Sequence, residues 1–275
     1  MRDLSAPSKS ASFLAKLEPV GKWNVTARLR KLPYYVASYV ALRGLIAKGR
    51  ILPRPSRRVE LRDGLSFSVS GLLDLLILKE TFVDDVYGLR ELDGTAPGCI
   101  VDVGAGFGDF SVLAATRFPS ADVLAFEPLP AAFQLLGHNL IENGIKNVTA
   151  RQLAVGTRGS ETLVSGRAQA RASASSSRGR AVVVPARRLE DLLERRSPDL
   201  LKIDCEGAEL DVLESAGDAL SRARRIVVEY HRRLLPDADR LVAELLTKRG
   251  FDVRIRPDPY DRGLGYVVGT TKSLR

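Results

Sequence analysis

The residues best suited to chemistry follow a short apolar segment near the middle of the sequence. Residues 99–103 (CIVDV) have the composition of a buried strand, and a glycine-rich stretch comes directly after them. Glycines permit positive φ angles and let a backbone approach a ligand without an intervening Cβ. The N–H groups at the start of a following helix suit a carboxylate or phosphate. The pattern predicts a ligand-binding turn made of Gly104, Ala105, Gly106, Phe107 and Gly108.

Three details favour S-adenosylmethionine over a dinucleotide as the ligand of this turn. The glycines are spaced G-x-G-x-G, whereas dinucleotide-binding turns have G-x-G-x-x-G. Asp102 precedes the first glycine by two residues, where an anion suits the ammonium group of the donor and opposes a pyrophosphate. Glu127 and Pro128 end the next apolar segment, where a carboxylate can accept hydrogen bonds from ribose hydroxyls. The third detail alone does not separate the two cofactors.

Two later segments carry the polar groups that a methyl acceptor needs. Asp204-Cys-Glu206-Gly-Ala-Glu209 and Glu229-Tyr-His231 each follow or end an apolar run. A hydroxyl is a poor nucleophile at neutral pH and benefits from a base or a metal. We expect His231, with an ordinary pKa near 6.5, or Asp204 to accept the proton, and Glu229 to orient the base or supply charge.

Other interpretations of these polar groups stay open. Glu229 and His231 could form a structural pair or cap a turn, and Glu206 and Glu209 could serve the first turn of a helix. Asp204 with Glu206 or Glu229 could instead hold a divalent ion, although no metal is expected.

Strand-type and helix-type segments alternate through the part of the chain that contains these groups. Strands are expected near 99–103, 122–126, 148–153, 200–204 and 226–230, with a closing pair near 251–255 and 265–269; helices are expected near 110–117, 130–143, 189–195, 209–214 and 238–249. Alternation with nearly continuous apolar strands predicts an α/β fold whose mostly parallel sheet has helices on both faces. The polar groups then belong at the carboxyl ends of the strands, where such sheets bind ligands.

Several motifs in this order resemble the FkbM-type methyltransferases. They are VDVGAGFGDF (101–110), AFEPLPAAFQLLGHNLIENGIKNV (125–148), LAVG (153–156), LEDLL (189–193), LLKIDCEGAEL (200–210) and VVEYH (227–231). The resemblance runs from about Val59 to Gly269. It implies a Rossmann-like class I methyltransferase fold with a seven-stranded sheet whose last strand is antiparallel. It also implies an O-methyltransferase that uses S-adenosylmethionine, with Asp102, the three glycines and Glu127 at the donor and Ala154 near its adenine.

The remaining segments predict a three-part organisation. Residues 1–57 form a basic helical extension, residues 58–97 a hairpin and helix, and residues 98–275 the methyltransferase domain with an Arg/Ser-rich loop at 165–180. In the extension, Pro33 suits the first turn of an amphipathic helix that continues to Lys48. Such a helix can dock on its own domain, on nucleic acid or on a membrane surface.

Charge placement supports the rival functions that we keep open. Residues 1–62 hold 14 Lys/Arg against 3 Asp/Glu, whereas the rest of the chain holds 28 against 30. The acceptor is expected to be a hydroxyl on a small molecule or glycan. Alternatives are RNA, including ribose 2′-hydroxyls, and a lipid-linked acceptor at a membrane surface. No asparagine-proline-proline-aromatic motif of base amine methylation is present.

Two cysteines, no apolar stretch of about 20 residues and no signal peptide predict a cytoplasmic protein without a transmembrane segment.

Overall fold

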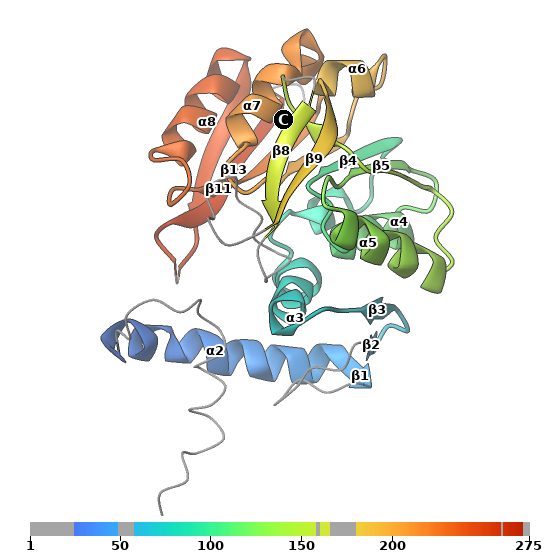
Figure 1. The fold of residues 1–275 in the computed structure, drawn as a ribbon, viewed down its shortest axis with the longest axis vertical. Helices are drawn as coiled ribbons and strands as arrows, with labels where there is room; N and C mark the ends of the chain where they lie inside the picture. The colour runs from blue at the N-terminus through green and yellow to red at the C-terminus, as the bar shows by residue number, and fades with distance from the viewer. Residues whose placement is uncertain (1–24, 49–57, 158–159, 166–179, 260, 272–275) are drawn as a thin grey trace, which may run out of the picture.

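A seven-stranded sheet forms the centre of the molecule (Figure 1). The computed structural model describes residues 25–48, 58–157, 160–165, 180–259 and 261–271. The strand order is β12-β13-β11-β10-β4-β5-β6. The strands are β4 (Cys99–Val103), β5 (Asp122–Phe126), β6 (Val148–Arg151), β10 (Leu200–Ile203), β11 (Arg225–His231), β12 (Phe251–Pro257) and β13 (Leu264–Thr271). Only β13 runs antiparallel to its neighbours, β11 and β12. This topology confirms the fold class that the sequence predicts.

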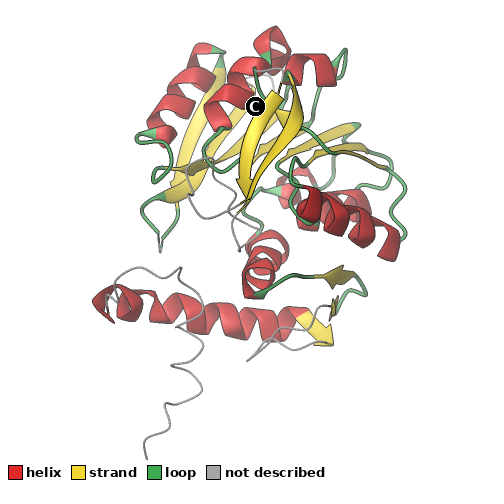
Figure 2. Cartoon of the chain, viewed as in Figure 1, coloured by secondary structure: helices red, strands yellow, loops and turns green. Residues whose placement is uncertain are grey.

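Helices cover both faces of this sheet, as expected (Figure 2). The helices on one face are α6 (Leu189–Leu193), α7 (Glu209–Ser215), the 3-10 helix η3 (Gly217–Arg222) and α8 (Ala238–Lys248). They pack with Val101, Leu201 and Ile226 of the strands. On the other face, α4 (Asp109–Arg117) and the 3-10 helix η2 (Leu89–Leu92) pack with Ile100, Leu200 and Val227. Helix α5 (Pro130–Glu142) lies beside α4. Alternate residues of each strand therefore enter different cores.

The strand order of the sheet reverses between β4 and β10, so their carboxyl ends form a topological switch point. From β4 the chain proceeds outward through β5 to β6, and it returns to β10 on the opposite side of β4. Ligands of open α/β sheets bind at such a switch point. The glycine-rich turn follows β4, and Asp204 follows β10.

A hairpin and a helix lead into the sheet, as the sequence predicts. Strands β2 (Arg58–Leu61) and β3 (Ser66–Ser68) pair antiparallel, and α3 (Leu72–Lys79) continues into a π-helical turn, η1 (Glu80–Asp84). The amide of Asn139 in α5 hydrogen-bonds the backbone of Ser68, at 2.7 Å and 3.2 Å. This anchors the hairpin on the main domain.

The helix of the N-terminal extension is longer, and ends earlier, than the sequence predicts. Helix α2 spans Val25–Leu45, so Pro33 lies in its interior and not in its first turn. The predicted end near Lys48 is wrong, because residues 46–48 form a short strand, β1 (Ile46–Lys48), that pairs with β2. In Figure 1, α2 crosses the lower part of the molecule, with α3 between it and the sheet.

The strand predicted near 148–153 is two residues shorter than expected, and a separate short strand of another sheet follows it. Strand β6 ends at Arg151, and β7 (Ala154–Val155) joins a small second sheet with β8 (Ser160–Ser165) and β9 (Arg180–Arg187). Strands β8 and β9 pair antiparallel on either side of the Arg/Ser-rich loop that is predicted at residues 165–180. Most of that loop, residues 166–179, lies outside the described residues, as do residues 1–24 and 49–57 of the extension. Among the described helices, none has the length and hydropathy to cross a membrane.

Candidate active site

The glycine-rich turn packs closely against the two loops beside it. Gly104, Gly106 and Gly108 all have positive φ, at 80°, 56° and 91°. A Cβ on Gly104 would lie 1.8 Å from the carbonyl oxygen of Asp204, so no other residue fits there without moving the backbone. A Cβ on Gly106, by contrast, would meet no atom within 4 Å. The middle glycine therefore borders open space, while the first glycine holds the turn against the loop after β10.

Glu127 lies where the sequence places it, beside the middle glycine. Its carboxylate accepts hydrogen bonds from the backbone N–H of Gly106 and of Leu129, both at 2.8 Å. Burial raises its pKa to about 7, against the effect of these hydrogen bonds. Each carboxylate oxygen has two lone pairs, so both retain the capacity to accept a hydroxyl. The proposed contact with ribose stays a prediction that this geometry permits.

The other predicted donor-site residues contribute through their backbones or border the site. The side chains of Ala105 and Phe107 are buried in the hydrophobic cluster that includes Leu136 of α5. Ala154 is buried in the small second sheet, and Pro128 is half-buried next to Glu127. The side chains of Ala105 and Phe107 thus anchor the turn in the hydrophobic core.

Asp102 does not present its carboxylate to a ligand, which corrects the role expected from the sequence. The side chain is completely buried and accepts hydrogen bonds from Lys202 Nζ at 2.8 Å and Ser111 Oγ at 2.6 Å. Lys202 lies directly opposite Asp102 in the pairing of β10 with β4. Its ammonium also donates to the carbonyl of Gly104 at 2.8 Å. Asp102 and Lys202 together support the turn from the interior of the sheet.

Lys202 is a residue of the site that the sequence interpretation missed. Burial opposes its charge, but the carboxylates of Asp102 and Asp204 outweigh burial and raise its pKa above the usual value. A lysine between Leu201 and Ile203 in an apolar strand was the available signal. Buried charges are nearly always paired, so this lysine required a carboxylate on a neighbouring strand.

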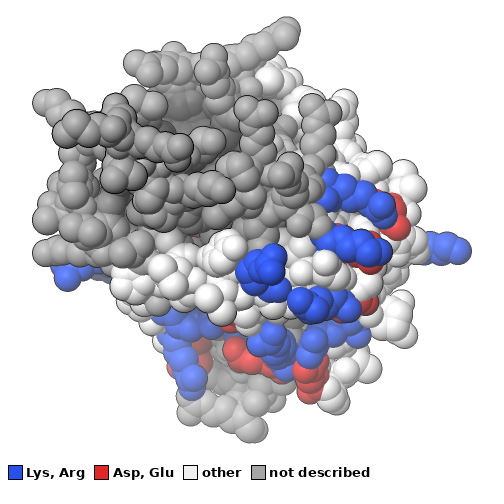
Figure 3. Space-filling view, turned by 90° about the horizontal axis from the view of Figure 1, so that it is seen from below, with Lys and Arg blue, Asp and Glu red and all other residues white. Residues whose placement is uncertain are grey.

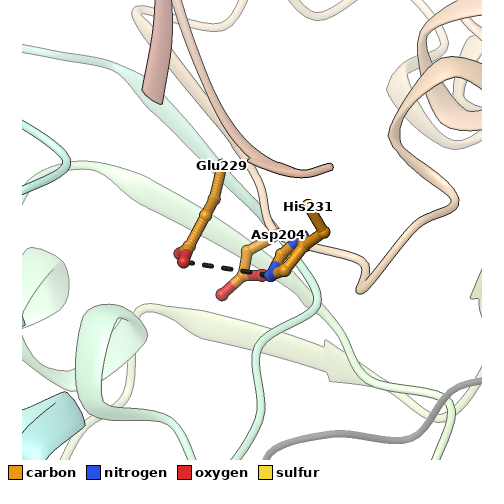
Figure 4. Close-up of side chains that lie close together, drawn as sticks. All are labelled: Asp204, Glu229 and His231. Atoms are coloured by element: carbon orange, nitrogen blue, oxygen red, sulfur yellow. Dashed lines mark ion pairs between the residues drawn. The ribbon is translucent and has the colours of Figure 1, made fainter. Parts of the chain in front are cut away.

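Asp204, Glu229 and His231 come together at the carboxyl ends of β10 and β11 (Figure 4). The Nε2 atom of His231 lies 3.9 Å from Asp204 Oδ1 and 3.9 Å from Glu229 Oε1. The hydroxyl of Tyr87 lies 3.2 Å from the second oxygen of Asp204 and 3.1 Å from that of Glu229. The three residues proposed for catalysis therefore share one site, and Tyr87, which the sequence interpretation missed, bridges the two carboxylates.

The environment of His231 changes the role that its ordinary pKa suggests. Its Nδ1 atom lies 2.7 Å from Glu209 Oε1, and Glu209 is completely buried. Burial lowers the pKa of His231, but the hydrogen bond to Glu209 and the charges of Asp204 and Glu206 outweigh burial and raise that pKa to about 10. The imidazole is therefore protonated at neutral pH and cannot accept a proton from a hydroxyl, which leaves Asp204 as the better candidate for the base.

Comparison with known proteins identifies the family. The model of the FkbM methyltransferase domain matches residues 102–253. The methyltransferase sdnD of Sordaria araneosa is 31% identical in an alignment of 231 residues that covers 70% of this chain and 87% of that relative. The chain belongs to the FkbM methyltransferase family. It is an S-adenosylmethionine-dependent methyltransferase. Methyltransferase 1 of Beauveria bassiana is 28% identical and covers 58% of this chain and 76% of its own length.

Among solved structures, the FkbM methyltransferase of Methylobacillus flagellatus is similar to this chain. It has 18% sequence identity and a TM-score of 0.48, and the match covers 72% of this chain and 52% of that one.

The residues of this FkbM-family methyltransferase fit S-adenosylmethionine. Open space lies beside Gly106, and the carboxylate of Glu127 borders it. Helix α4 begins at Asp109, directly after the turn, so its free N–H groups suit the carboxylate of the donor. When bound, the donor supplies a methyl group activated by a positively charged sulfur. The contact of Gly104 with Asp204 places this donor turn next to the Asp204–Glu229–His231 cluster.

Proposed function

We propose that this enzyme transfers the methyl group of S-adenosylmethionine to a hydroxyl of a small-molecule or glycan-type acceptor. The observation that carries the proposal is the position of Asp204. Its backbone packs on Gly104 of the donor turn, and its side chain belongs to the polar cluster with Glu229 and His231. A carboxylate next to the transferable methyl group is suited to receive the proton of a hydroxyl nucleophile.

The proposed reaction is a single in-line displacement. The hydroxyl oxygen forms a bond to the methyl carbon, and the carbon–sulfur bond breaks with its electron pair going to sulfur. The hydroxyl proton passes to Asp204, whose Oδ2 accepts a hydrogen bond from the hydroxyl of Tyr87 that holds the carboxylate in place. Alignment of oxygen, carbon and sulfur is the main requirement of such a transfer. Glu229 and protonated His231 fix the position of Asp204 and of the acceptor.

Amine methylation is disfavoured by the residues at this strand end. Asp204-Cys205-Glu206-Gly207 occupies the position where base amine methyltransferases carry an asparagine and two prolines. Four carboxylates lie around His231, close to the donor turn: Asp204, Glu206, Glu209 and Glu229. They suit the removal of a proton from a hydroxyl better than the binding of a neutral exocyclic amine.

RNA and lipid-linked acceptors stay predictions, because the segments that suggest them lie largely outside the described residues. On the face of the body shown in Figure 3, basic side chains lie next to acidic ones. Arg117 with Asp93, Arg224 with Asp199 and Arg233 with Asp261 are ion pairs. Within the described part of the chain, charges paired in this way do not form the continuous basic surface that nucleic acid binding favours.

Product identification tests the proposed function directly. The full-length enzyme is incubated with S-adenosylmethionine carrying a ¹³C-methyl group and with cell extract, which is then separated into RNA, lipid and small-molecule fractions. We expect the label in the small-molecule or glycan fraction, and the carbon resonance of a methyl ether. Label on nitrogen or carbon would overturn O-methylation. Label in RNA or lipid would move the acceptor to one of the alternatives.

A matched pair of variants connects the product to the site. Asp204→Asn removes the proposed base and keeps the size of the side chain, so we expect methyl transfer to fall by about 100-fold or more with unchanged donor affinity. Glu214→Gln, at an exposed position of α7, is expected to behave as the wild type. Full activity of Asp204→Asn would show that another group receives the proton.

A further inference from the structure

The Asp204–Glu229–His231 cluster has a geometry that hydrogen bonding does not explain. We propose that these three side chains bind one divalent metal ion, which holds the acceptor hydroxyl beside the donor turn. The metal-binding part of this inference stands on the cluster alone. Its catalytic part rests on the proposed O-methylation.

The spacing of the three donor atoms matches the ligand shell of one ion. Nε2 of His231 lies 3.9 Å from the nearest oxygens of Asp204 and Glu229, and one atom from each residue falls within 4.8 Å of the others. These separations exceed a hydrogen bond of about 2.7–3.2 Å. Ligands about 2.0–2.2 Å from a shared ion are about 3–4 Å apart. The gap between the three atoms therefore has the size of a cation.

The histidine is held in the orientation of a metal ligand. Its side chain is more than nine-tenths buried, and its Nδ1 atom is bound to the completely buried Glu209, at 2.7 Å. This contact directs Nε2 toward Asp204 and Glu229, and a bound ion would replace the proton that Nε2 carries in the ion-free enzyme. Metal-binding histidines in proteins almost always have such a partner on the second ring nitrogen, which fixes the tautomer and the plane of the ring.

Tyr87 arranges the two carboxylates in the same way. Its hydroxyl lies within hydrogen-bond distance of Asp204 Oδ2 and Glu229 Oε2, so the remaining oxygens, Oδ1 and Oε1, are the ones nearest His231. The tyrosine ring is itself fixed by edge contacts with Phe110 and Tyr266. Each proposed ligand thus has its non-ligating atom held by another buried side chain.

The charge around the gap favours a cation. Four carboxylates surround the single imidazole: Asp204, Glu206, Glu209 and Glu229. The nearby ammonium of Lys202 donates to Asp102 and to the carbonyl of Gly104, on the side of the donor turn. A divalent ion would offset the mutual repulsion of these partly buried carboxylates.

The donor set indicates which ions fit. Carboxylates suit Mg²⁺ and Mn²⁺, and imidazole suits first-row transition metals, so two carboxylates with one imidazole favour Mn²⁺ or Zn²⁺ over Ca²⁺. Three protein ligands leave coordination positions for the acceptor hydroxyl. In the ion-bound enzyme Asp204 is a ligand, so Glu206, whose Oε2 lies 3.6 Å from Nε2 of His231, takes the hydroxyl proton in its place; Asp204 receives this proton only in an enzyme that binds no ion. The ion does not change its oxidation state.

Metal binding is measured first, without any acceptor. Full-length enzyme stripped with a chelator is titrated with Mn²⁺, and free Mn²⁺ is followed by electron paramagnetic resonance, with Zn²⁺ and Mg²⁺ as competitors. We expect one saturable site per chain. Glu229→Gln and His231→Gln should each weaken binding at least about tenfold, while the exposed control Glu214→Gln leaves it unchanged. Absence of a saturable site for all three ions would overturn the proposal.

Two further measurements distinguish loss of the metal site from loss of the fold. Thermal unfolding of each variant shows whether it is folded, and anomalous scattering from Mn²⁺-soaked wild-type crystals locates the ion independently of any variant. A peak away from Asp204, Glu229 and His231 would overturn the proposed site. If Mn²⁺ binds there but the product is not a methyl ether, the metal site stands and the proposed function fails. If methyl ether forms equally in stripped enzyme, the catalytic role of the ion fails.

Discussion

Lys202 has a position that joins the sheet to the donor turn. Its ammonium contacts both Asp102 on the neighbouring strand and the carbonyl of Gly104, and its charge lies close to the rings of Tyr87 and Phe110. Neutralising one member of a buried pair leaves the other charge unpaired, which is more harmful than removing both. Lys202 therefore helps to fix the position of the donor turn.

We predict that Lys202→Met lowers the free energy of unfolding by about 3–5 kcal/mol, because Asp102 then stays buried without its partner. The double variant Asp102→Asn/Lys202→Met should lose less than the sum of the two single variants. Urea unfolding of the four proteins measures this coupling. Lys48→Met, which removes an exposed ion pair with Glu60, should change stability by less than about 1 kcal/mol. Additive losses in the double variant would contradict the role given to the pair.

Asp109 is expected to make the free energy of unfolding fall as pH rises, because its pKa is higher in the folded chain than in the unfolded chain. Burial raises its pKa from 3.8 to about 6, against the effects of Lys202 and of the hydrogen bond from Thr81 at 2.5 Å. The unfolded chain loses this proton at lower pH than the folded chain, so the folded state binds more protons between these values. The contribution of Asp109 to stability is therefore complete below about pH 4 and is lost as pH rises through about 6.

Asp109→Asn should remove this pH dependence, because the amide does not ionise and can still accept the hydrogen bond of Thr81. Relative to the variant, the wild type should lose about 2–3 kcal/mol of unfolding free energy between about pH 4 and pH 7. Urea unfolding at several pH values gives the difference. Asp63→Asn, in the exposed hairpin turn, serves as the control. Parallel curves for wild type and Asp109→Asn would show that the folded-state pKa is not raised.

Among the secondary-structure elements, α2 is the one whose role the sequence leaves open. Tyr35, Leu42 and Ile46, at and just after its carboxyl-terminal half, are buried, and Tyr34 donates a hydrogen bond to Glu80 at 2.9 Å. Val36, Tyr39 and Val40 are instead exposed, with Val40 at 64%. The predicted apolar face thus divides into a docked side and an exposed side. Docking on the enzyme's own body is confirmed for the described part of this helix.

Replacing one residue from each side of α2 should have very different effects. Leu42→Ala removes a side chain that is 2% exposed and shares a core with Val59 and Phe107, so we expect a loss of about 2–5 kcal/mol. Val40→Ala should change stability by less than about 0.5 kcal/mol. Thermal or urea unfolding distinguishes the two. Equal, small effects would show that α2 does not dock in solution.

The strands of the sheet could be predicted well from the sequence, while the contacts between distant segments could not. Strands β4 and β5 have the predicted bounds, because each is a short apolar run between glycine, proline or polar turn residues. Strand β1 was missed because only its pairing with β2, more than ten residues away, distinguishes it from a continuing helix.

The same limit applies to the site. The positions of Glu127, Asp204, Glu229 and His231 follow from the strand ends, which the sequence shows. The pairing of His231 with Glu209 and the approach of Tyr87 depend on loop conformations that no local pattern encodes. Glu206, for example, has a φ of 49°, which is unusual for a residue other than glycine.

For the whole molecule, donor binding and folding are linked. The hydrophobic cluster that holds Ala105 and Phe107 of the donor turn also holds Leu42, Phe67 and Leu136 from three other elements. A ligand that binds only the folded chain at 100 times its Kd should raise the free energy of unfolding by about 2.7 kcal/mol. We predict this stabilisation for S-adenosylmethionine and none for NAD at the same concentration. Calorimetry with the two ligands measures it, and equal stabilisation by NAD would contradict the assignment of the donor turn.

Strand β13 has a consequence for how the enzyme becomes active as it is synthesised. It is later in the chain than every other described strand, yet it lies between β11 and β12. Its residues Leu264 and Tyr266 pair with His231 and Glu229. A ribosome-bound chain that has already formed the donor turn would still lack the strand that supports the acceptor residues. Donor binding should therefore be acquired during translation before catalysis is, and catalysis only after residue 271 has left the exit tunnel.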